Sequence, residues 1–151
     1  MSFREEIARK LGVILVISTF IIPATAAAAD DDISLYDSTG AAVAYISPSD
    51  QMTIYLWDGT PVAYLDQDGT SVYGFNGEHL GWLQGAVIIG RDGNVACAMK
   101  DALANPQLEP LKGLKRLPPL RSIEQIAPIK PIQLNSWSDV SCTVLLTTGQ
   151  S

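Results

Sequence analysis

Hydrophobic and polar positions follow a short pattern that occurs four times between residues 33 and 100. Each copy has an apolar-rich segment, a dipeptide that ends in glycine, and a second apolar-rich segment. The turn glycines are Gly40, Gly59, Gly77 and Gly93, at steps of 19, 18 and 16 residues. One step has room for only two strands and a connection, whereas a propeller blade needs about forty residues. The pattern therefore predicts four consecutive β-hairpins.

The dipeptides of the last three copies are typical of tight hairpin turns. They read Asp58-Gly59, Asn76-Gly77 and Asp92-Gly93. A two-residue type I′ turn needs positive φ at both central positions, which glycine adopts freely and Asn or Asp tolerate. Such a turn would pair Tyr55 with Val62 and would place His79 opposite Gly74. The first copy, with Thr39-Gly40, allows a longer loop.

Aromatic residues recur at matched places around the turns. Four residues before the glycines stand Tyr36, Tyr55, Tyr73 and Ile89; five residues after the first three stand Tyr45, Tyr64 and Trp82. The fourth copy reads as one residue shorter, which puts Cys97 in the aromatic position. Because strand side chains alternate, both faces of these strands are largely apolar, and we expect burial on both sides. A single hairpin is unstable in water, but four can bury one another's faces.

Two segments carry a resemblance to a known family. YLWDGTPVAYL (residues 55–65) and VYGFNGEHLGWL (residues 72–83) resemble the bacterial 4-fold beta flower domain. The resemblance covers roughly residues 33–100. The outer copies depart from it, since the first has an extra residue before its glycine and the fourth has Cys97 for an aromatic. It implies an all-β fold of four tandem hairpins around a pseudo-fourfold axis, and it implies no established activity.

Residues 1–29 have the pattern of a secretory signal peptide. A weakly positive start precedes the apolar stretch 11–22, and small residues suited to cleavage follow, after Ala26 or as late as Ala29. The apolar stretch is shorter than the roughly twenty residues of a membrane span, so no stable span is expected after cleavage. We expect a periplasmic or secreted bacterial protein. An uncleaved N-terminal anchor is the alternative.

The charge is unevenly distributed along the chain. The whole sequence has a formal net charge of −6. Residues 30–102 contribute −9 and residues 103–151 contribute +2. A basic tail can therefore be attracted to an acidic domain, within about a Debye length. An acidic folded domain is a poor match for nucleic acid, which is bound by basic surfaces.

Residues 103–135 form a proline-rich segment that follows the hairpin domain, residues 33–102. Its prolines exclude a long helix or a central strand. Leucine or isoleucine recurs at every third position: Leu108, Leu111, Leu114, Leu117, Leu120, Ile123, Ile126, Ile129 and Ile132. A period of three matches a polyproline II helix and predicts one apolar ridge. We expect the ridge to pack against the hairpin domain or a neighbouring molecule, because an exposed ridge favours aggregation. A disordered linker is the alternative.

The last part of the chain, residues 136–151, is predicted to form a short terminal strand and a tail. The strand would cover residues 136–147, with Trp137 as a packing anchor. Cys97 and Cys142 are the only cysteines, and an exported chain favours a disulfide between them. Two separate buried thiols are the alternative.

Candidate chemistry is sparse. Aromatic rings stack on sugars, so Tyr55, Tyr64, Tyr73 and Trp82 are candidates for binding a sugar or a peptidoglycan fragment; the alternative is that they fill the core. The only histidine, His79, has no second imidazole for a metal site and no serine motif around it. Asp66 and Asp68 have part of a calcium-loop spacing, but turn geometry alone accounts for such aspartates. The sequence indicates no metal and no cofactor.

These observations favour a non-enzymatic module of the cell envelope or extracellular space that binds a partner or has a structural role. An envelope-polymer hydrolase that uses carboxylates is one alternative, and it requires two carboxylates in one cleft with shifted pKa values. A protein that self-associates through its tail is another. The ligand and the partner are not identified by the sequence.

Overall fold

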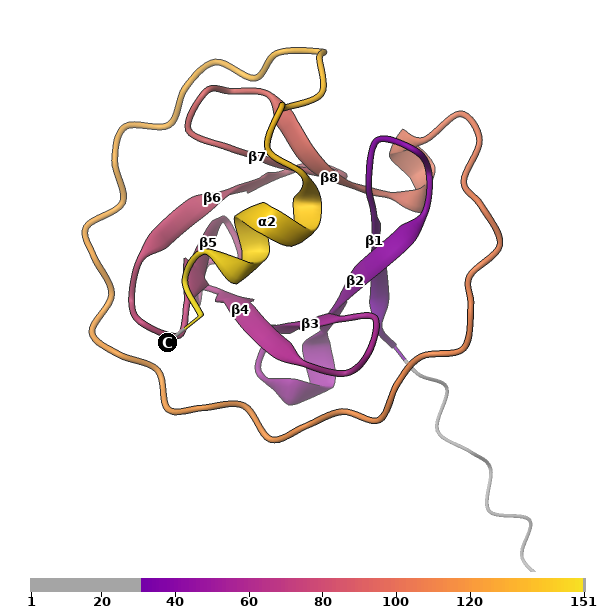
Figure 1. Ribbon diagram of the computed structural model, residues 1–151. Helices are drawn as coiled ribbons and strands as arrows, with labels where there is room; N and C mark the ends of the chain where they lie inside the picture. The colour runs from indigo at the N-terminus through magenta and orange to yellow at the C-terminus, as the bar shows by residue number, and fades with distance from the viewer. Residues whose placement is uncertain (1–30, 151) are drawn as a thin grey trace, which may run out of the picture.

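The computed structural model describes residues 31–150, and these form a closed barrel of eight antiparallel strands (Figure 1). The predicted signal peptide, residues 1–29, lies outside the described residues. The strands are β1 (Ile33–Tyr36), β2 (Ala42–Ser47), β3 (Thr53–Leu56), β4 (Pro61–Leu65), β5 (Ser71–Gly74), β6 (His79–Gln84), β7 (Val87–Ile89) and β8 (Val95–Met99). Two short 3-10 helices, η1 (Pro48–Asp50) and η2 (Lys100–Ala102), and one helix, α2 (Cys142–Thr147), complete the regular structure. The all-β prediction is confirmed.

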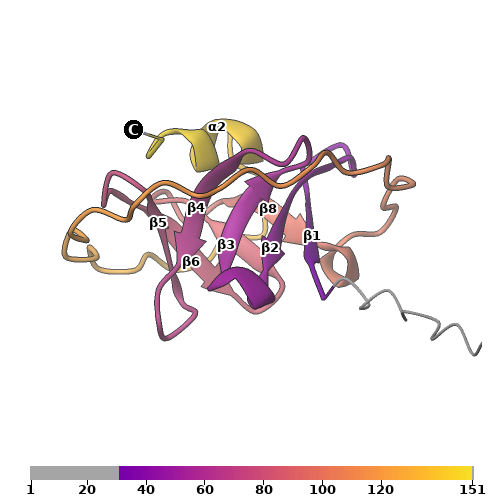
Figure 2. The same cartoon turned by 90° about the horizontal axis from the view of Figure 1, so that it is seen from below.

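Every strand pairs with its neighbours in sequence, and β8 closes the barrel by pairing with β1. The turn glycines of the sequence pattern lie in the β1–β2, β3–β4, β5–β6 and β7–β8 connections. These four turns lie at the end of the barrel that carries α2, and the other connections lie at the opposite end (Figure 2).

The turn type was predicted wrongly. In the second hairpin the Gly59 N–H donates to Leu56 O (2.9 Å), and the Leu56 N–H donates to Thr60 O (2.8 Å). Only the glycine has positive φ, at 89° for Gly59, so the connection is a type I turn followed by a glycine bulge and not a type I′ turn. The other three connections have the same Gly N–H bond to the residue three positions earlier. The first copy therefore needs no longer loop.

The bulge also changes the strand register. Tyr55 pairs with Pro61 rather than Val62, and His79 pairs with Tyr73 rather than Gly74. In the fourth hairpin Ala98 pairs with Val87, at the position that corresponds to Tyr45 on β2. The fourth copy is therefore not shortened, and Ala98, not Cys97, stands in the aromatic position. Cys97 is left on the strand face that points into the barrel.

The interior of the barrel is a single apolar cluster. It contains Leu35, Ala44, Ile46, Ile54, Val62, Ala63, Leu65, Val72, Leu80, Ile88, Ala96 and Cys97, together with Cys142 and Leu146 from α2. Helix α2 covers one end of the barrel, and the predicted disulfide, Cys97–Cys142, is present. Cys142 and Leu146 are four residues apart, so they lie on the same face of α2 and both reach the interior.

The terminal strand predicted for residues 136–147 is wrong. Only Trp137 makes a β-bridge, with Val95, and residues 142–147 are helical. A closed barrel has no free edge that an added strand could extend. Ser141 begins the helix instead, because its hydroxyl accepts a hydrogen bond from the Val144 N–H (3.3 Å).

Residues 105–134, here called the belt, run around the outside of the barrel without helix or strand (Figures 1 and 2). One belt N–H donates to the carbonyl oxygen of each turn glycine. The pairs are Gln107 N–Gly40 O, Arg116 N–Gly59 O, Gln125 N–Gly77 O and Leu134 N–Gly93 O, at 2.8–2.9 Å. Successive donors are nine residues apart. Nine residues are three turns of a helix with three residues per turn, so three turns of the belt lead from one hairpin turn to the next.

The belt does not pack its apolar ridge on the barrel, which was one of the two predicted arrangements; packing on a neighbouring molecule stays a prediction. Its nine Leu and Ile side chains from Leu108 to Ile132, here called the rim, are 86–98% exposed and point away from the barrel. The predicted three-residue period is consistent with this arrangement, because all nine side chains share one side. The inward side carries Lys112, Lys115 and Arg121 instead, because the barrel surface presents aromatic rings that attract cations.

Candidate functional site

Between the barrel wall and the belt lies a layer of aromatic rings. Tyr45 on β2 stacks on Tyr55 on β3 (5.5 Å between centroids), and Tyr64 on β4 stacks on Tyr73 on β5 (6.1 Å). Each pair joins strands of two neighbouring hairpins. The rings are thus shared between hairpins, and the belt contacts them from outside.

Belt cations lie over these rings. Lys112 Nζ is 4.5 Å from the Tyr45 centroid, and the Arg121 guanidinium carbon is 3.9 Å from the Tyr64 centroid. Cation–π contacts contribute about 0.5–2 kcal/mol each, more where water is excluded. In the belt, Arg121 follows Lys112 by nine residues, in step with the hydrogen bonds to the turn glycines.

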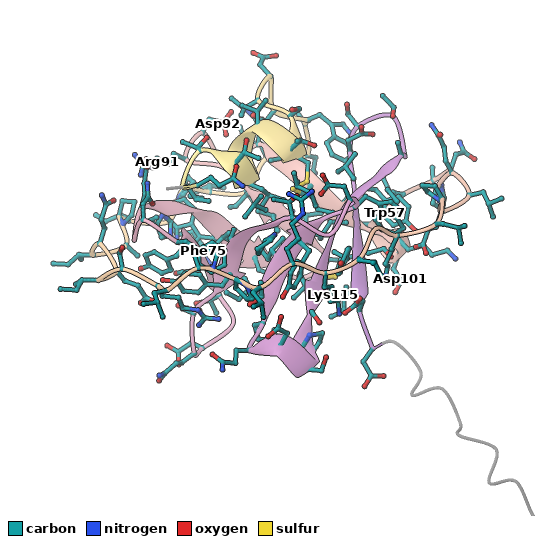
Figure 3. All side chains as sticks on the ribbon, turned by 60° about the horizontal axis from the view of Figure 1, so that its bottom comes forward. Trp57, Phe75, Arg91, Asp92, Asp101 and Lys115 are labelled. Atoms are coloured by element: carbon teal, nitrogen blue, oxygen red, sulfur yellow. A yellow bond between two sulfur atoms is a disulfide. The ribbon has the colours of Figure 1, made fainter. Side chains whose placement is uncertain are left out.

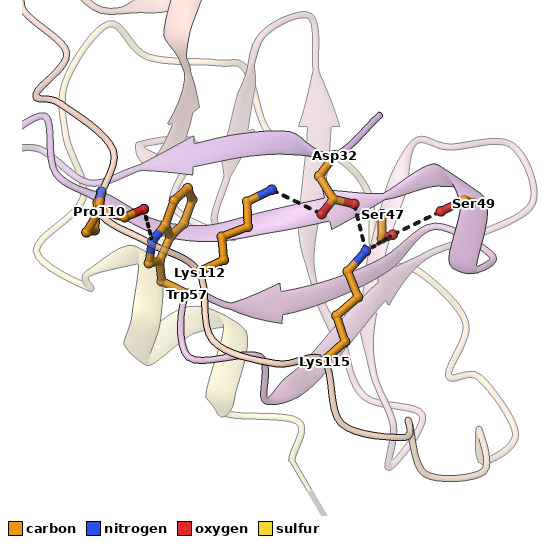
Figure 4. A network of polar contacts seen from close by, with 7 residues as sticks. All are labelled: Asp32, Ser47, Ser49, Trp57, Pro110, Lys112 and Lys115. Atoms are coloured by element: carbon orange, nitrogen blue, oxygen red, sulfur yellow. Dashed lines mark hydrogen bonds and ion pairs between the residues drawn. The ribbon is translucent and has the colours of Figure 1, made fainter. Parts of the chain in front are cut away.

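Asp32 holds the belt at the point where the described chain begins (Figure 4). Its carboxylate accepts from Lys112 Nζ (3.1 Å) and Lys115 Nζ (3.0 Å), and its side chain is 1% exposed. Lys115 also donates to the Ser47 hydroxyl (2.9 Å). Nearby, the Trp57 indole N–H donates to Pro110 O (3.1 Å). These groups attach the first third of the belt to β2, to the β3–β4 turn and to the segment before β1.

A second carboxylate contact lies near η2. The Tyr36 hydroxyl donates to Glu109 Oε1 (2.6 Å). Burial, with the neighbouring Glu109, raises the pKa of Tyr36 to about 12. Hydrogen bonds from Ser34 and Tyr36 lower the pKa of Glu109. The belt carboxylate is therefore ionised at neutral pH.

The aromatic residues named as ligand candidates are all buried, and Tyr55, Tyr64 and Tyr73 contact the belt. Their exposed fractions are 1% for Tyr55, 0% for Tyr64, 5% for Tyr73 and 5% for Trp82. The Tyr55 hydroxyl donates to Asp50, and the Tyr73 hydroxyl donates to Gln125 O (3.1 Å). No ring in this set offers a face to solvent, so a sugar would reach them only after the belt had moved.

The rim is the largest exposed apolar feature among residues 31–150. The Leu and Ile side chains follow the whole length of the belt, while the polar side chains between them reach the barrel. The sequence pattern identified these residues, and of the two surfaces predicted to cover them the hairpin domain is contradicted by their exposure. The missed signal was the nine-residue recurrence of cations, Lys112, Arg121 and Lys130, which equals the interval between the belt residues that bond successive turn glycines.

A cavity of about 370 Å³ lies at the α2 end, between the third and fourth hairpins. Its apolar lining comes from Leu80, Ala96, Val140 and Leu145, and its polar lining from Glu78, His79, Arg91, Asp92, Ser138 and Thr148. Figure 3 shows Arg91 and Asp92 on the side of the barrel that carries α2. Sequence reasoning missed this cavity because α2, which forms one wall, was predicted as a strand.

Arg91 is the only cation that lines the cavity. Its Nη2 donates to His79 O (2.8 Å) and lies 4.0 Å from Glu78 Oε1. The Asp92 carboxylate accepts from Asn94 and from the Ser138 hydroxyl, and the Asn94 bonds lower the pKa of Asp92.

His79 is buried between Tyr73 and Trp82, with centroid distances of 5.2 and 4.5 Å. Among the described residues neither of its ring nitrogens has a hydrogen-bond partner. Burial lowers the pKa of His79, and the nearby Arg91 lowers it further, so the imidazole is neutral at pH 7.

The aspartates considered for calcium have a local role. Asp66 Oδ1 accepts from the N–H groups of Thr70 and Ser71 (2.8 and 3.1 Å), as turn aspartates commonly do.

In residues 31–150 no helix has both the length and the apolar character that crossing a membrane requires.

Comparison with known proteins gives one match. Residues 33–146 match the model of the family described as 4-fold beta flower protein. No curated protein and no solved structure matches the chain.

Proposed function

This chain belongs to the 4-fold beta flower family. Because the belt exposes a row of large apolar side chains, we propose that the protein is a non-enzymatic binding module of the cell envelope or extracellular space. The rim is, in this proposal, the surface that binds the partner. In this proposal the hairpins are related by a pseudo-fourfold axis and form a rigid support, and the belt presents apolar side chains outward. Export through the predicted signal peptide would bring the module to its partner.

The observation that carries the proposal is the exposure of the rim, 86–98% over nine large apolar side chains. Burying one Leu or Ile contributes about 1.5–3 kcal/mol, which at 25 cal/mol per Å² corresponds to roughly 60–120 Å². Nine side chains then present on the order of 500–1,000 Å². This area is distributed around the barrel, and a row of apolar side chains of this extent is uncommon on the surface of a monomer.

The shape of the rim favours a protein partner with a concave surface. Two convex rims meet over only a short arc, which buries little of the roughly 1,200 Å² that a stable interface needs. A bilayer would have to accept belt backbone groups that have no partner in hydrocarbon. A protein groove can offer hydrogen bonds to an extended backbone and pockets for side chains about 9 Å apart, as polyproline II recognition does.

The experiment compares the mature protein with a double variant, Leu117→Ser with Leu120→Ser, in the middle of the rim. Val144→Ser is the matched control, because Val144 is 56% exposed and lies outside the rim. Envelope proteins captured by the parent are identified, and the purified partner is titrated against all three proteins. We expect the double variant to bind at least about tenfold more weakly, with an unchanged melting temperature, and the control to bind like the parent.

Three results would overturn the proposal. The first is equal affinity of the double variant and the parent. The second is saturable binding to lipid vesicles that depends on the rim, which would assign the surface to membranes. The third is a rim-dependent increase of mass with concentration, which would assign it to self-association.

The hydrolase alternative has less support. Glu78 and Asp92 both line the cavity, as a two-carboxylate mechanism requires. However, the pKa of Asp92 is lowered, whereas a general acid needs a raised pKa.

A further inference from the structure

We propose that the cavity at the α2 end binds a free α-amino acid with an apolar side chain. The site is separate from the rim, because no residue of the belt lines it. Its volume of about 370 Å³ is near the lower end of the range for small-molecule pockets, about 300–1,000 Å³, so the ligand must be small.

Arg91 occupies a position of the repeat that the second and third hairpins fill with packed rings and the first fills with Ser38. Two residues before the turn glycine, the second and third hairpins have Trp57 and Phe75, which pack on Tyr45 (5.9 Å) and Tyr64 (5.7 Å). The fourth hairpin has Arg91 at that position. An arginine with a 57% exposed side chain fills this region less completely than a packed ring.

The charges of the site match a zwitterion. Arg91 Nη2 and Glu78 Oε1 are 4.0 Å apart, and both side chains are partly exposed. An α-amino acid carries its carboxylate and ammonium groups on the same carbon, so it can place the carboxylate on the Arg91 guanidinium and the ammonium beside Glu78. A planar guanidinium suits a carboxylate because it can donate two parallel N–H bonds.

One nitrogen of the Arg91 guanidinium is already held by the protein before a ligand arrives. The His79 carbonyl accepts an N–H from Arg91 Nη2 (2.8 Å), and Glu78 Oε1 lies 4.0 Å from the same nitrogen, whereas the other guanidinium nitrogens make no hydrogen bond within residues 31–150. Asp92 is already engaged by Asn94 and Ser138. Glu78 is therefore the carboxylate left for an ammonium group. A simple anion would meet the repulsion of both carboxylates without compensation, whereas the ammonium group of a zwitterion is attracted to Glu78.

The apolar part of the lining selects the side chain. Leu80 and Ala96 are each 3% exposed and form the base with Leu145, which packs against the barrel core. An aliphatic side chain that enters this region loses contact with water, as these residues have done. His79 also lines the cavity, and neither of its ring nitrogens has a hydrogen-bond partner in the described chain.

The test is calorimetric titration of the disulfide-bonded mature protein with L-leucine. Two analogues each lack one charge: 4-methylpentanoate has no ammonium group, and 3-methylbutylamine has no carboxylate. L-aspartate keeps both groups but has a polar side chain. We expect saturable binding of leucine and at least about tenfold weaker binding of all three other compounds.

Two variants test the residues. Arg91→Gln and Glu78→Gln should each weaken leucine binding at least about tenfold, because each removes a charged partner. Arg116→Gln is the matched control; it removes an arginine of the belt and should leave binding unchanged. Circular dichroism of each variant establishes that it is folded. Absence of saturable leucine binding up to about 10 mM, or equal binding by folded Arg91→Gln and the parent, overturns the proposal.

Discussion

Replacement of Gly77 by alanine tests whether the belt is bound to the hairpin turns. Gly77 has φ of 85°, and an added Cβ would overlap the carbonyl oxygen of Ile123 in the belt. Gly69, in the connection between β4 and β5, has φ of 69° and no atom within 4 Å of an added Cβ. Both substitutions pay the cost of a side chain in the left-handed region. Only Gly77→Ala also displaces the belt.

The expected magnitude follows from the contacts at this turn. A left-handed alanine costs about 1–2 kcal/mol, partly offset by about 0.4–1 kcal/mol from the more restricted unfolded chain. Moving the belt away from Gly77 weakens Gln125 N–Gly77 O and Ser122 N–Phe75 O, both 2.9 Å. Each hydrogen bond contributes about 0.5–1.5 kcal/mol. We therefore expect Gly77→Ala to reduce the free energy of unfolding by about 1–3 kcal/mol more than Gly69→Ala.

The assay is equilibrium unfolding in urea of the oxidised mature chain, followed by tryptophan fluorescence. Parent and variants are compared at fixed pH, with a common slope to confirm that the unfolded states are alike. If Gly77→Ala and Gly69→Ala lower the free energy of unfolding equally, within about 0.5 kcal/mol, the belt does not contact the turn that contains Gly77. The arrangement of residues 105–134 around the barrel would then be refuted.

Two further predictions concern the charged and titrating groups. Asp32→Asn should lower the free energy of unfolding by about 2–3 kcal/mol, because Lys112 and Lys115 lose the carboxylate they share. Asp31→Asn, at an exposed residue, is the control. Equal urea midpoints for the two variants would contradict the role of Asp32. Burial and Arg91 hold the pKa of His79 below its ordinary 6.5, so the unfolded chain binds the proton more readily and stability should fall as the pH drops below about 6.5. Urea midpoints at pH 7.5, 6 and 5 should show this loss of stability in the parent and not in His79→Gln. These pH values lie above those at which the carboxylates with lowered pKa titrate. Parallel pH profiles of parent and variant would show that the pKa of His79 does not change on folding.

The all-β fold could be predicted because its signal, the turn glycines, is local in the sequence. The disulfide could be predicted because the chain has only two cysteines. The turn glycines at near-regular steps, and two cysteines in a chain with a predicted export signal, leave few options. The register did not follow, because a type I turn with a glycine bulge and a type I′ turn both use an Asp-Gly pair. The single extra residue of the bulge moved the partner of Tyr55 from Val62 to Pro61.

The longer-range features were missed for a different reason. Whether residues 142–147 form a strand or a helix depends on whether the sheet has a free edge, and closure by β1 and β8 is a property of the whole barrel. The side of the belt that faces inward depends on what the barrel surface presents. Tyr45 and Tyr64 attract cations, so the apolar side of the belt faces out, although hydrophobicity alone favours the opposite.

The fixed nine-residue interval of the belt limits how the length of this chain can change. Loops at the end of the barrel opposite α2, such as the one that contains Gly69, can gain or lose residues without moving any turn glycine. In the belt, deletion of one residue would rotate every later side chain onto another edge. Deletion of three would keep the rim outward but carry Arg121 away from Tyr64. Only a change of nine residues, together with one whole hairpin, would preserve both alignments, so belt and barrel must lengthen or shorten as one unit.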